Sequence, residues 1–175
     1  MKKIKFGIAL IVVLVLRFVP HPANFEPITA TLMPYSRRMS VWVSVAMAFL
    51  SIFLYDIISG SFGVWSTFTA GSYMLLAWFF AWVLRGKANN PWMYVVYGCI
   101  GTVLYDVVTA LVISSGIYGQ GVVEVLVMQV PFTINHLLST VVTGFVLSPL
   151  IDRWLVSEEA VSFDWRGVLP LAWRK

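Results

Sequence analysis

The stretch FGIALIVVLVLRFVPHPANFEP, residues 6–27, places an unbroken apolar run directly before a polar segment that contains three prolines. Residues 6–16 carry no polar side chain, whereas residues 17–27 hold an arginine, a histidine, an asparagine and a glutamate. Proline interrupts a helix because it lacks an N–H donor and its ring clashes with the preceding turn. The stretch therefore predicts a first apolar helix that ends near residue 19, followed by a second, short helix.

The remainder of the chain is similarly apolar. Of its 175 residues, 59% are hydrophobic and only 11% are charged, and the mean hydropathy is +0.85. A soluble domain of this length could not bury so much apolar surface, so we expect lipid to be the solvent. The composition predicts an all-α integral membrane protein, with one transmembrane domain over residues 1–156 and a cytoplasmic interfacial tail over residues 157–175.

The apolar runs predict about six membrane segments, because a helix needs about 20 residues to cross a bilayer. The expected ranges are 4–19, 25–35, 39–59, 66–84, 91–114 and a last segment from Pro131 to about residue 155. The short second segment is expected to end at Pro34. A last helix counted from Gly121 would be about 52 Å long, far more than a bilayer needs, so residues 121–130 are expected to form a separate interfacial or re-entrant piece.

The basic residues indicate the orientation of these segments. They follow or precede alternate segments: Lys2, Lys3, Lys5, Arg37, Arg38, Arg85, Lys87 and Arg153. The loops SGSFGVW and SSGIYGQG carry no lysine or arginine. Under the positive-inside rule, we expect both termini to be cytoplasmic and the number of membrane segments to be even. The net charge of +4 is spread over segment ends, so a lipid bilayer is the expected environment and no nucleic-acid partner is predicted.

The polar residues of the predicted segments gather toward the outer side, where Arg17 is the single base. Ionisable groups in a membrane span are costly and normally face the protein interior or a water-filled cavity. We therefore predict an outward-facing pocket for a small molecule and expect no comparable polar cluster in the inner half. The predicted substrate-binding residues are Asp56, Trp65, Tyr105, Asp106, Glu124, Asn135, His136 and Asn24, with Arg17, His21 and Glu26 in a loop or lid.

Each group in this predicted pocket has an expected role. The ligand would stack on Trp65 and Tyr105, while Asp106, Asn135 and His136 would fix its polar groups. A carboxylate-lined, desolvated pocket repels negative charge, which favours a neutral or cationic ligand over a polyanion.

Structural roles remain open for the same residues. Arg17 can form an ion pair with Glu26 or Asp106 that only supports the loop, and His136 can be an interior histidine with satisfied hydrogen bonds. Small residues four apart, such as Ala77 and Ala81, are typical of helix packing.

Several classes of chemistry lack their sequence signals. One cysteine and two histidines exclude a thiolate zinc cluster and a histidine-rich metal site, and no phosphate-binding G-x-x-x-x-G-K-[ST] is present. We therefore predict no cofactor, no metal and no enzymatic activity. A small membrane enzyme that uses Asp106 and His136 as an acid–base pair is the last-ranked alternative.

Two motifs resemble a known group. RFVPHPANFEPITA, residues 17–30, is similar to the R-x-x-P-H-P-x-N-F-x-P signature of membrane proteins related to the substrate-binding (S) components of energy-coupling factor (ECF) transporters. QVPFTINHLLSTVVTGFVLSPLID, residues 129–152, resembles the P-F-x-x-N region of that group's last helix. The matching positions are Arg17, His21, Asn24, Glu26 and Asn135.

The resemblance implies a six-helix S-component fold that captures a vitamin or related micronutrient. It also implies partners in trans, a transmembrane T component and two ABC-type ATPase subunits. Many S components dock on the T component through A-x-x-x-A in the first helix, which this chain lacks; Ala77 and Ala81 form its one such motif. A scaffold or assembly protein of similar fold, such as the rod-shape protein MreD, is the alternative.

Overall fold

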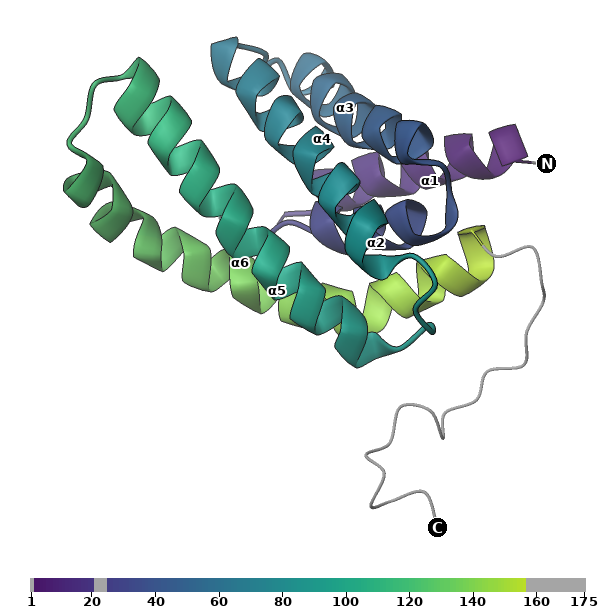
Figure 1. The fold of residues 1–175 in the computed structure, drawn as a ribbon. Helices are drawn as coiled ribbons and strands as arrows, with labels where there is room; N and C mark the ends of the chain where they lie inside the picture. The colour runs from purple at the N-terminus through teal and green to yellow at the C-terminus, as the bar shows by residue number, and fades with distance from the viewer. Residues whose placement is uncertain (1, 21–24, 157–175) are drawn as a thin grey trace, which may run out of the picture.

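The computed structural model describes residues 2–20 and 25–156, and within these ranges it is all-helical. The chain forms six α-helices, and α5 and α6 each continue into a π-helical segment, called η1 and η2 (Figure 1). The elements are α1 (Lys2–Phe18), α2 (Ile28–Arg38), α3 (Val41–Ile58), α4 (Val64–Leu84), α5 (Pro91–Thr109), η1 (Ala110–Ile117), α6 (Val122–Ile151) and η2 (Asp152–Val156). The predicted tail over residues 157–175 lies outside the described residues.

Four of the helices are long and apolar enough to cross a membrane, which suggests a membrane protein. They are α3, α4, α5 together with η1, and α6 together with η2, whereas the apolar part of α1 covers only Phe6–Phe18. The start of α5 shows how the sequence sets these bounds. The Asn90 side chain accepts a hydrogen bond from the Trp92 N–H at 2.9 Å, and Pro91 occupies the first turn, where a missing N–H costs nothing.

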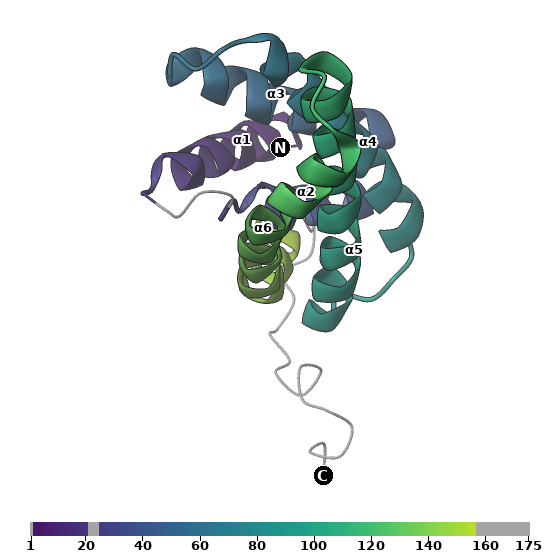
Figure 2. The same ribbon diagram turned by 90° about the vertical axis from the view of Figure 1, so that its left-hand side faces the viewer.

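The short helix α2 lies at the centre of the bundle. It contacts each of the other five α-helices and η2, and every residue from Ile28 to Ser36 is buried. The α3–α4 hairpin covers one side of α2, while α5 and α6 cross each other on another side (Figures 1 and 2). The neighbours of α2 therefore determine its stability more than its own 11 residues do.

The second helix does not end at Pro34, contrary to the sequence prediction; it continues to Arg38. A proline at this position cannot donate to the carbonyl of residue 30, four positions earlier. The Ser148 hydroxyl from α6 donates to that Ala30 carbonyl oxygen at 2.7 Å. A neighbouring helix thus supplies the donor that Pro34 removes, which is how prolines are accommodated in membrane helices.

Replacing Ser148 by alanine is expected to leave the Ala30 carbonyl buried without a partner. The free energy of unfolding should fall by about 1–3 kcal/mol, the cost of an unsatisfied buried acceptor. Ser72→Ala is the matched control, because the Ser72 hydroxyl donates to Phe68 of its own helix at an exposed position. Equal losses for the two variants, measured by SDS titration of the detergent-solubilised protein, would contradict the role given to Ser148.

The last helix is also longer than predicted. The structure has no separate piece at residues 121–130; α6 runs unbroken from Val122 to Ile151, with Pro131 inside it. Pro131 and the side chain one turn earlier, Val127, are both exposed, so the ring lies on the surface of the bundle. With η2 the helical segment has 35 residues and a length of about 52 Å, which a bilayer accommodates by tilt or by projection of one end.

The end of the bundle that was predicted to face inward differs from the prediction that it holds no comparable polar cluster. The Asp152 carboxylate is fully buried and accepts two hydrogen bonds from Arg37 Nη1, at 2.9 and 2.7 Å, and one from Arg38 Nε at 2.9 Å. Arg37 Nε also donates to the Lys87 carbonyl at 2.9 Å, and Arg85 Nη2 donates to the Met39 carbonyl at 3.1 Å. These contacts join α2, the α4–α5 loop and η2 at one end of the bundle.

Small residues allow the central helices to approach closely. A Cβ added at Gly101 of α5 would lie 2.5 Å from the Phe80 ring of α4, and one at Gly98 would lie 2.8 Å from Thr140 of α6. Ala77 and Ala81 are also fully buried, packed inside the bundle. The structure therefore does not place the predicted partner-docking motif on the surface, and its methyl groups serve packing within the chain.

Candidate functional site

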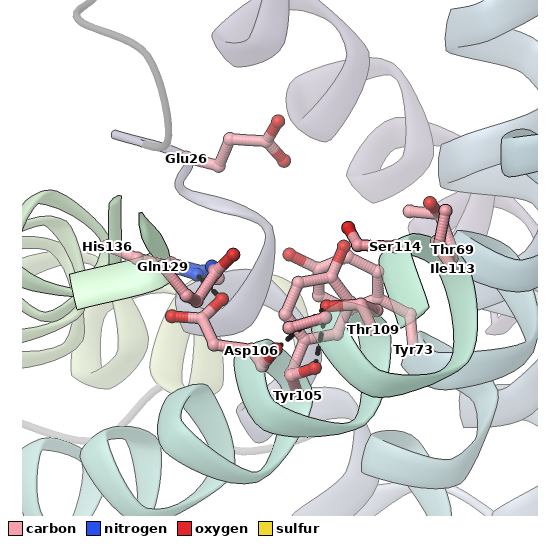
Figure 3. Close-up of a pocket in the computed structure, with 11 residues that line it drawn as sticks. Glu26, Thr69, Tyr73, Tyr105, Asp106, Thr109, Ile113, Ser114, Gln129 and His136 are labelled. Carbon is pink, nitrogen blue, oxygen red and sulfur yellow. Dashed lines mark hydrogen bonds and ion pairs between the residues drawn. The ribbon is translucent and has the colours of Figure 1, made fainter. Parts of the chain in front are cut away.

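A cavity of about 240 Å³ opens between α4, α5 with η1, the middle of α6 and Glu26, two residues before α2 (Figure 3). Most of its lining side chains carry an oxygen or nitrogen atom. They are Glu26, Thr69, Tyr73, Tyr105, Asp106, Thr109, Ala110, Ile113, Ser114, Gln129 and His136. Three of the predicted pocket residues, Tyr105, Asp106 and His136, are among them, together with Glu26 of the predicted lid.

Asp106 and His136 form a buried pair in this cavity. The Nδ1 atom of His136 lies 3.0 Å from Oδ1 of Asp106, and the two residues are only 3% and 2% exposed. If the Asp106 carboxyl is ionised, its oxygen can only accept, and Nδ1 of His136 then carries the hydrogen. The other two polar atoms, Oδ2 of Asp106 and Nε2 of His136, are buried and have no hydrogen-bond partner among the described residues. Buried polar atoms are nearly always paired, so a ligand is a natural partner for them.

Two tyrosines form an aromatic wall next to this pair. The rings of Tyr73 and Tyr105 are 4.5 Å apart, and the Tyr105 ring meets the His136 ring edge-on at 5.6 Å. Such tilted and edge-to-face contacts restrict the orientation of each ring. The imidazole is therefore held by Asp106 on one side and by Tyr105 on another.

The helix that carries most of the cavity changes its winding there. The α-helical part of α5 ends at Thr109, whose hydroxyl donates to the carbonyls of Tyr105 and Asp106 at 2.8 and 3.3 Å. The π-helical segment η1 follows and contributes Ile113 and Ser114 to the lining. Widened turns of this kind are frequent at functional sites, and this one lies within one turn of Asp106.

Arg17 contacts Glu26, which lines the cavity, but is not itself among the lining residues. Its guanidinium donates to the Ser51 carbonyl at 3.2 Å and to Glu26 Oε1 at 3.4 Å, and its Cζ lies 3.8 Å from the centre of the Tyr55 ring. The side chain is buried. The structure thus places Arg17 in the ion pair with Glu26 that the sequence left open as a structural role.

Asn135 and Glu124, which were predicted to bind ligand, are not among the lining residues. In a continuous α-helix, adjacent residues point about 100° apart, so His136 faces the cavity while Asn135 is only half-buried. Glu124 is exposed in the first turn of α6, 12 residues before His136 and about 18 Å from it along the axis. There its charge suits the positive end of the helix dipole.

Two further predicted residues also lie elsewhere. Trp65 is 47% exposed at the start of α4, where its ring covers Gly63. Asp56 is buried in the last turn of α3 but does not line the cavity. The sequence contains Tyr-Asp twice, at residues 55–56 and 105–106. The two pairs have different surroundings, since Tyr55 stacks on Arg17 whereas Tyr105 lines the cavity. The predicted positions His21 and Asn24 lie outside the described residues.

Sequence reasoning missed several lining residues, although their spacing carries a signal. Thr69 and Tyr73 are four apart on α4, and Gln129 and His136 are seven apart on α6. Such spacings place side chains on one helix face. Four further lining residues follow Asp106 in α5 and η1 by three, four, seven and eight positions, which is the spacing of one helix face. They are Thr109, Ala110, Ile113 and Ser114.

The cavity shows no set of metal ligands. Across residues 2–20 and 25–156, no three His, Cys, Asp or Glu side chains lie close enough together to hold a metal ion. The cavity instead offers carboxylates, an imidazole, hydroxyls and an amide, which recognise polar groups of an organic molecule through hydrogen bonds.

Comparison with known proteins gives the chain a family. No curated protein and no solved structure matches it. Residues 2–154, which include all the helices that line the cavity, match a family of unknown function, DUF6580. The match covers well over half of the 175 residues, so the chain belongs to the family of unknown function DUF6580.

Proposed function

We propose that this protein captures a small organic molecule in the cavity around Asp106 and His136, as the substrate-binding subunit of an ECF-type importer. The observation that carries the proposal is the buried Asp106–His136 pair, which borders a cavity and retains two unpartnered polar atoms. A concave site with convergent polar groups and aromatic walls is the usual form of a small-molecule site.

In this proposal the chain crosses a prokaryotic cytoplasmic membrane with six segments and has both termini in the cytoplasm. Three contacts support this orientation, because they gather basic residues at one end of the bundle: Arg37 with the Lys87 carbonyl, Arg38 with Asp152, and Arg85 with the Met39 carbonyl. Asp106 follows Pro91 by 15 residues, or about 22 Å along α5, which puts the cavity toward the opposite, outer end.

The importer partners rest on the resemblance of residues 17–30 and 129–152 to S components. A T component and two ATPase subunits would supply the energy for uptake of a vitamin-like ligand. Ala77 and Ala81 are buried, so a T component would dock on another surface. Co-purification with these subunits distinguishes an importer subunit from a binding protein that acts alone.

The proposal predicts a defined pattern of ligand affinity. We expect native mass spectrometry of the purified protein to detect a bound small molecule, and Asp106→Ala and His136→Ala to weaken its binding by about 1–3 kcal/mol because its polar groups lose buried partners. This corresponds to roughly 5- to 150-fold in the dissociation constant.

Asn135→Ala is the matched control for His136→Ala. It truncates the adjacent side chain on the same helix turn, but Asn135 does not line the cavity, so the affinity should stay at the wild-type value. If Asp106→Ala and His136→Ala retain full affinity in folded protein, or if Asn135→Ala alone weakens binding, the cavity is not the capture site.

One observation favours a second function. A buried histidine oriented by a carboxylate at 3.0 Å, beside a cavity, is the arrangement of a general base. An enzyme built on this pair would convert the bound molecule into a different compound during incubation, detected as a new mass or, for an isomer, a new NMR spectrum, and His136→Ala would stop the conversion. A capture protein returns the molecule unchanged.

A further inference from the structure

We propose that the ligand of this cavity is a small, flat organic cation with at least two N–H donors, such as an amidinium or a protonated amino-heteroaromatic ring. The inference rests on the proposed function and names the chemical class of its ligand. It is carried by three features of the described residues: the charge of the lining, the hydrogen-bonding state of its two unpartnered atoms, and the shape of its aromatic wall.

The lining carries negative charge without a lysine or arginine. Among the 11 lining residues the ionisable acids and bases are Glu26, Asp106 and His136, apart from the two tyrosines. Arg17 compensates Glu26 from outside the cavity through its 3.4 Å contact. Within the described chain no lysine or arginine forms an ion pair with Asp106, whose side chain contacts His136 instead. A charge in a desolvated site acts strongly, so this carboxylate attracts a cation and repels an anion.

With an ionised Asp106 and a neutral His136, which is the state that the proposal takes for this pair, both unpartnered atoms accept hydrogen bonds. Oδ2 of an ionised Asp106 can only accept, and a neutral His136 that donates from Nδ1 presents Nε2 as an acceptor. A ligand with two N–H groups satisfies both atoms, whereas a carboxylate ligand satisfies neither. Hydrogen bonds between an ionised acceptor and a charged donor are also about twice as strong as neutral ones.

The aromatic wall favours a flat cation. Tyr73 and Tyr105, with rings 4.5 Å apart, line the cavity together with Asp106. Tyrosine faces attract organic cations, most strongly where water is excluded. Arg17 already shows this chemistry in the same protein, because its guanidinium lies 3.8 Å above the Tyr55 ring.

Three probes of the same size test the charge directly: benzamidine, benzamide and benzoate share a ring and differ in the charge of the substituent. At neutral pH we expect benzamidine to bind the detergent-solubilised full chain at least about tenfold more tightly than either of the others, measured by isothermal titration calorimetry. Asp106→Asn should remove this preference and weaken benzamidine at least about tenfold. The amide oxygen that this substitution introduces can still accept from His136 and hold the imidazole.

Two carboxylate controls complete the test. Glu124→Gln removes an exposed carboxylate far from the cavity and should leave benzamidine affinity unchanged. Glu26→Gln removes a carboxylate that Arg17 already compensates and should weaken benzamidine less than Asp106→Asn does. Far-UV circular dichroism and gel filtration of each variant show whether it is folded.

The outcomes distinguish a wrong ligand class from a wrong capture function. Benzoate binding as tightly as benzamidine, or an Asp106→Asn variant with unchanged preference, overturns the cationic class. A co-purified molecule that proves anionic also overturns the class but leaves the capture function standing. If no probe binds and no small molecule co-purifies, both the class and the proposed function are wrong.

Discussion

Replacing Asp152 by alanine is expected to lower the free energy of unfolding by about 3–5 kcal/mol, the cost of leaving a buried charge without its partner. The carboxylate is fully buried and accepts two hydrogen bonds from Arg37 and one from Arg38. The Arg37 side chain is only 6% exposed, so water cannot replace the lost acceptor. SDS titration of the protein in mild detergent, followed by circular dichroism, measures the loss.

The two arginines should respond differently to removal. The Arg38 side chain is 43% exposed and makes a single contact with Asp152, so Arg38→Ala should cost no more than about 1 kcal/mol. The double variant Arg37→Met/Asp152→Leu should recover most of the stability lost in Asp152→Ala, because apolar side chains of similar size often replace a buried ion pair without loss. A double variant less stable than Asp152→Ala would contradict this account.

Replacing Phe80 by alanine is expected to lower the free energy of unfolding by a similar amount, about 3–5 kcal/mol, because it empties a fully buried site between α4 and α5. Lipid is as apolar as the protein core, so the loss comes from lost packing contacts more than from exposure to water. Leu75→Ala on the same helix is the control, since Leu75 is 64% exposed and should cost little.

The effects of substitutions at Gly101 and Phe80 on the free energy of unfolding should not be additive. A methyl group at Gly101 would lie 2.5 Å from the Phe80 ring, so Gly101→Ala alone should cost about 1–3 kcal/mol through overpacking. The double variant Gly101→Ala/Phe80→Leu should cost less than the sum of the two single changes, because leucine leaves room for the methyl group. Strict additivity would show that the two positions do not share one packing contact.

The same contact connects stability to the candidate site. Gly101 lies one turn before Tyr105, and Phe80 lies two turns after Tyr73 on α4. The close approach of α4 and α5 at Gly101 therefore determines how near the Tyr73 and Tyr105 rings come to each other, which is 4.5 Å. Gly101→Ala is expected to weaken ligand binding even though Gly101 does not line the cavity.

The sequence predicted the parts of the fold that depend on composition and local pattern. An all-helical chain with apolar segments near residues 39–59, 66–84 and 91–114 follows from hydropathy and turn residues alone, and α3, α4 and α5 with η1 of the structure lie close to these ranges. Asp106 and His136 were predicted to bind ligand because polar groups in a membrane segment are costly, and Tyr105 was predicted as an aromatic on which the ligand stacks. The cavity brings these three residues together.

The effects of the prolines depended on neighbours that a local pattern does not contain. Pro34 was expected to end a helix, but Ser148, 114 positions later in the chain, supplies the missing donor to Ala30. Pro131 was expected to begin one, but it lies inside α6 with its ring exposed on the surface of the bundle. The two prolines are accommodated in different ways: a neighbouring helix supplies the missing donor at Pro34, whereas the ring of Pro131 lies on the surface of α6.

The sequence alone determined the class of protein and the presence of costly polar groups in apolar helices. Only the tertiary structure decided which of these groups meet. Asn135 and His136 are neighbours in sequence, yet the 100° step of the helix turns one of them away from the cavity. Asp106 and His136 are 30 positions apart, yet the crossing of α5 and α6 places them 3.0 Å from each other. Helix packing fixes such distances, because it depends on contacts between side chains that lie far apart in the sequence.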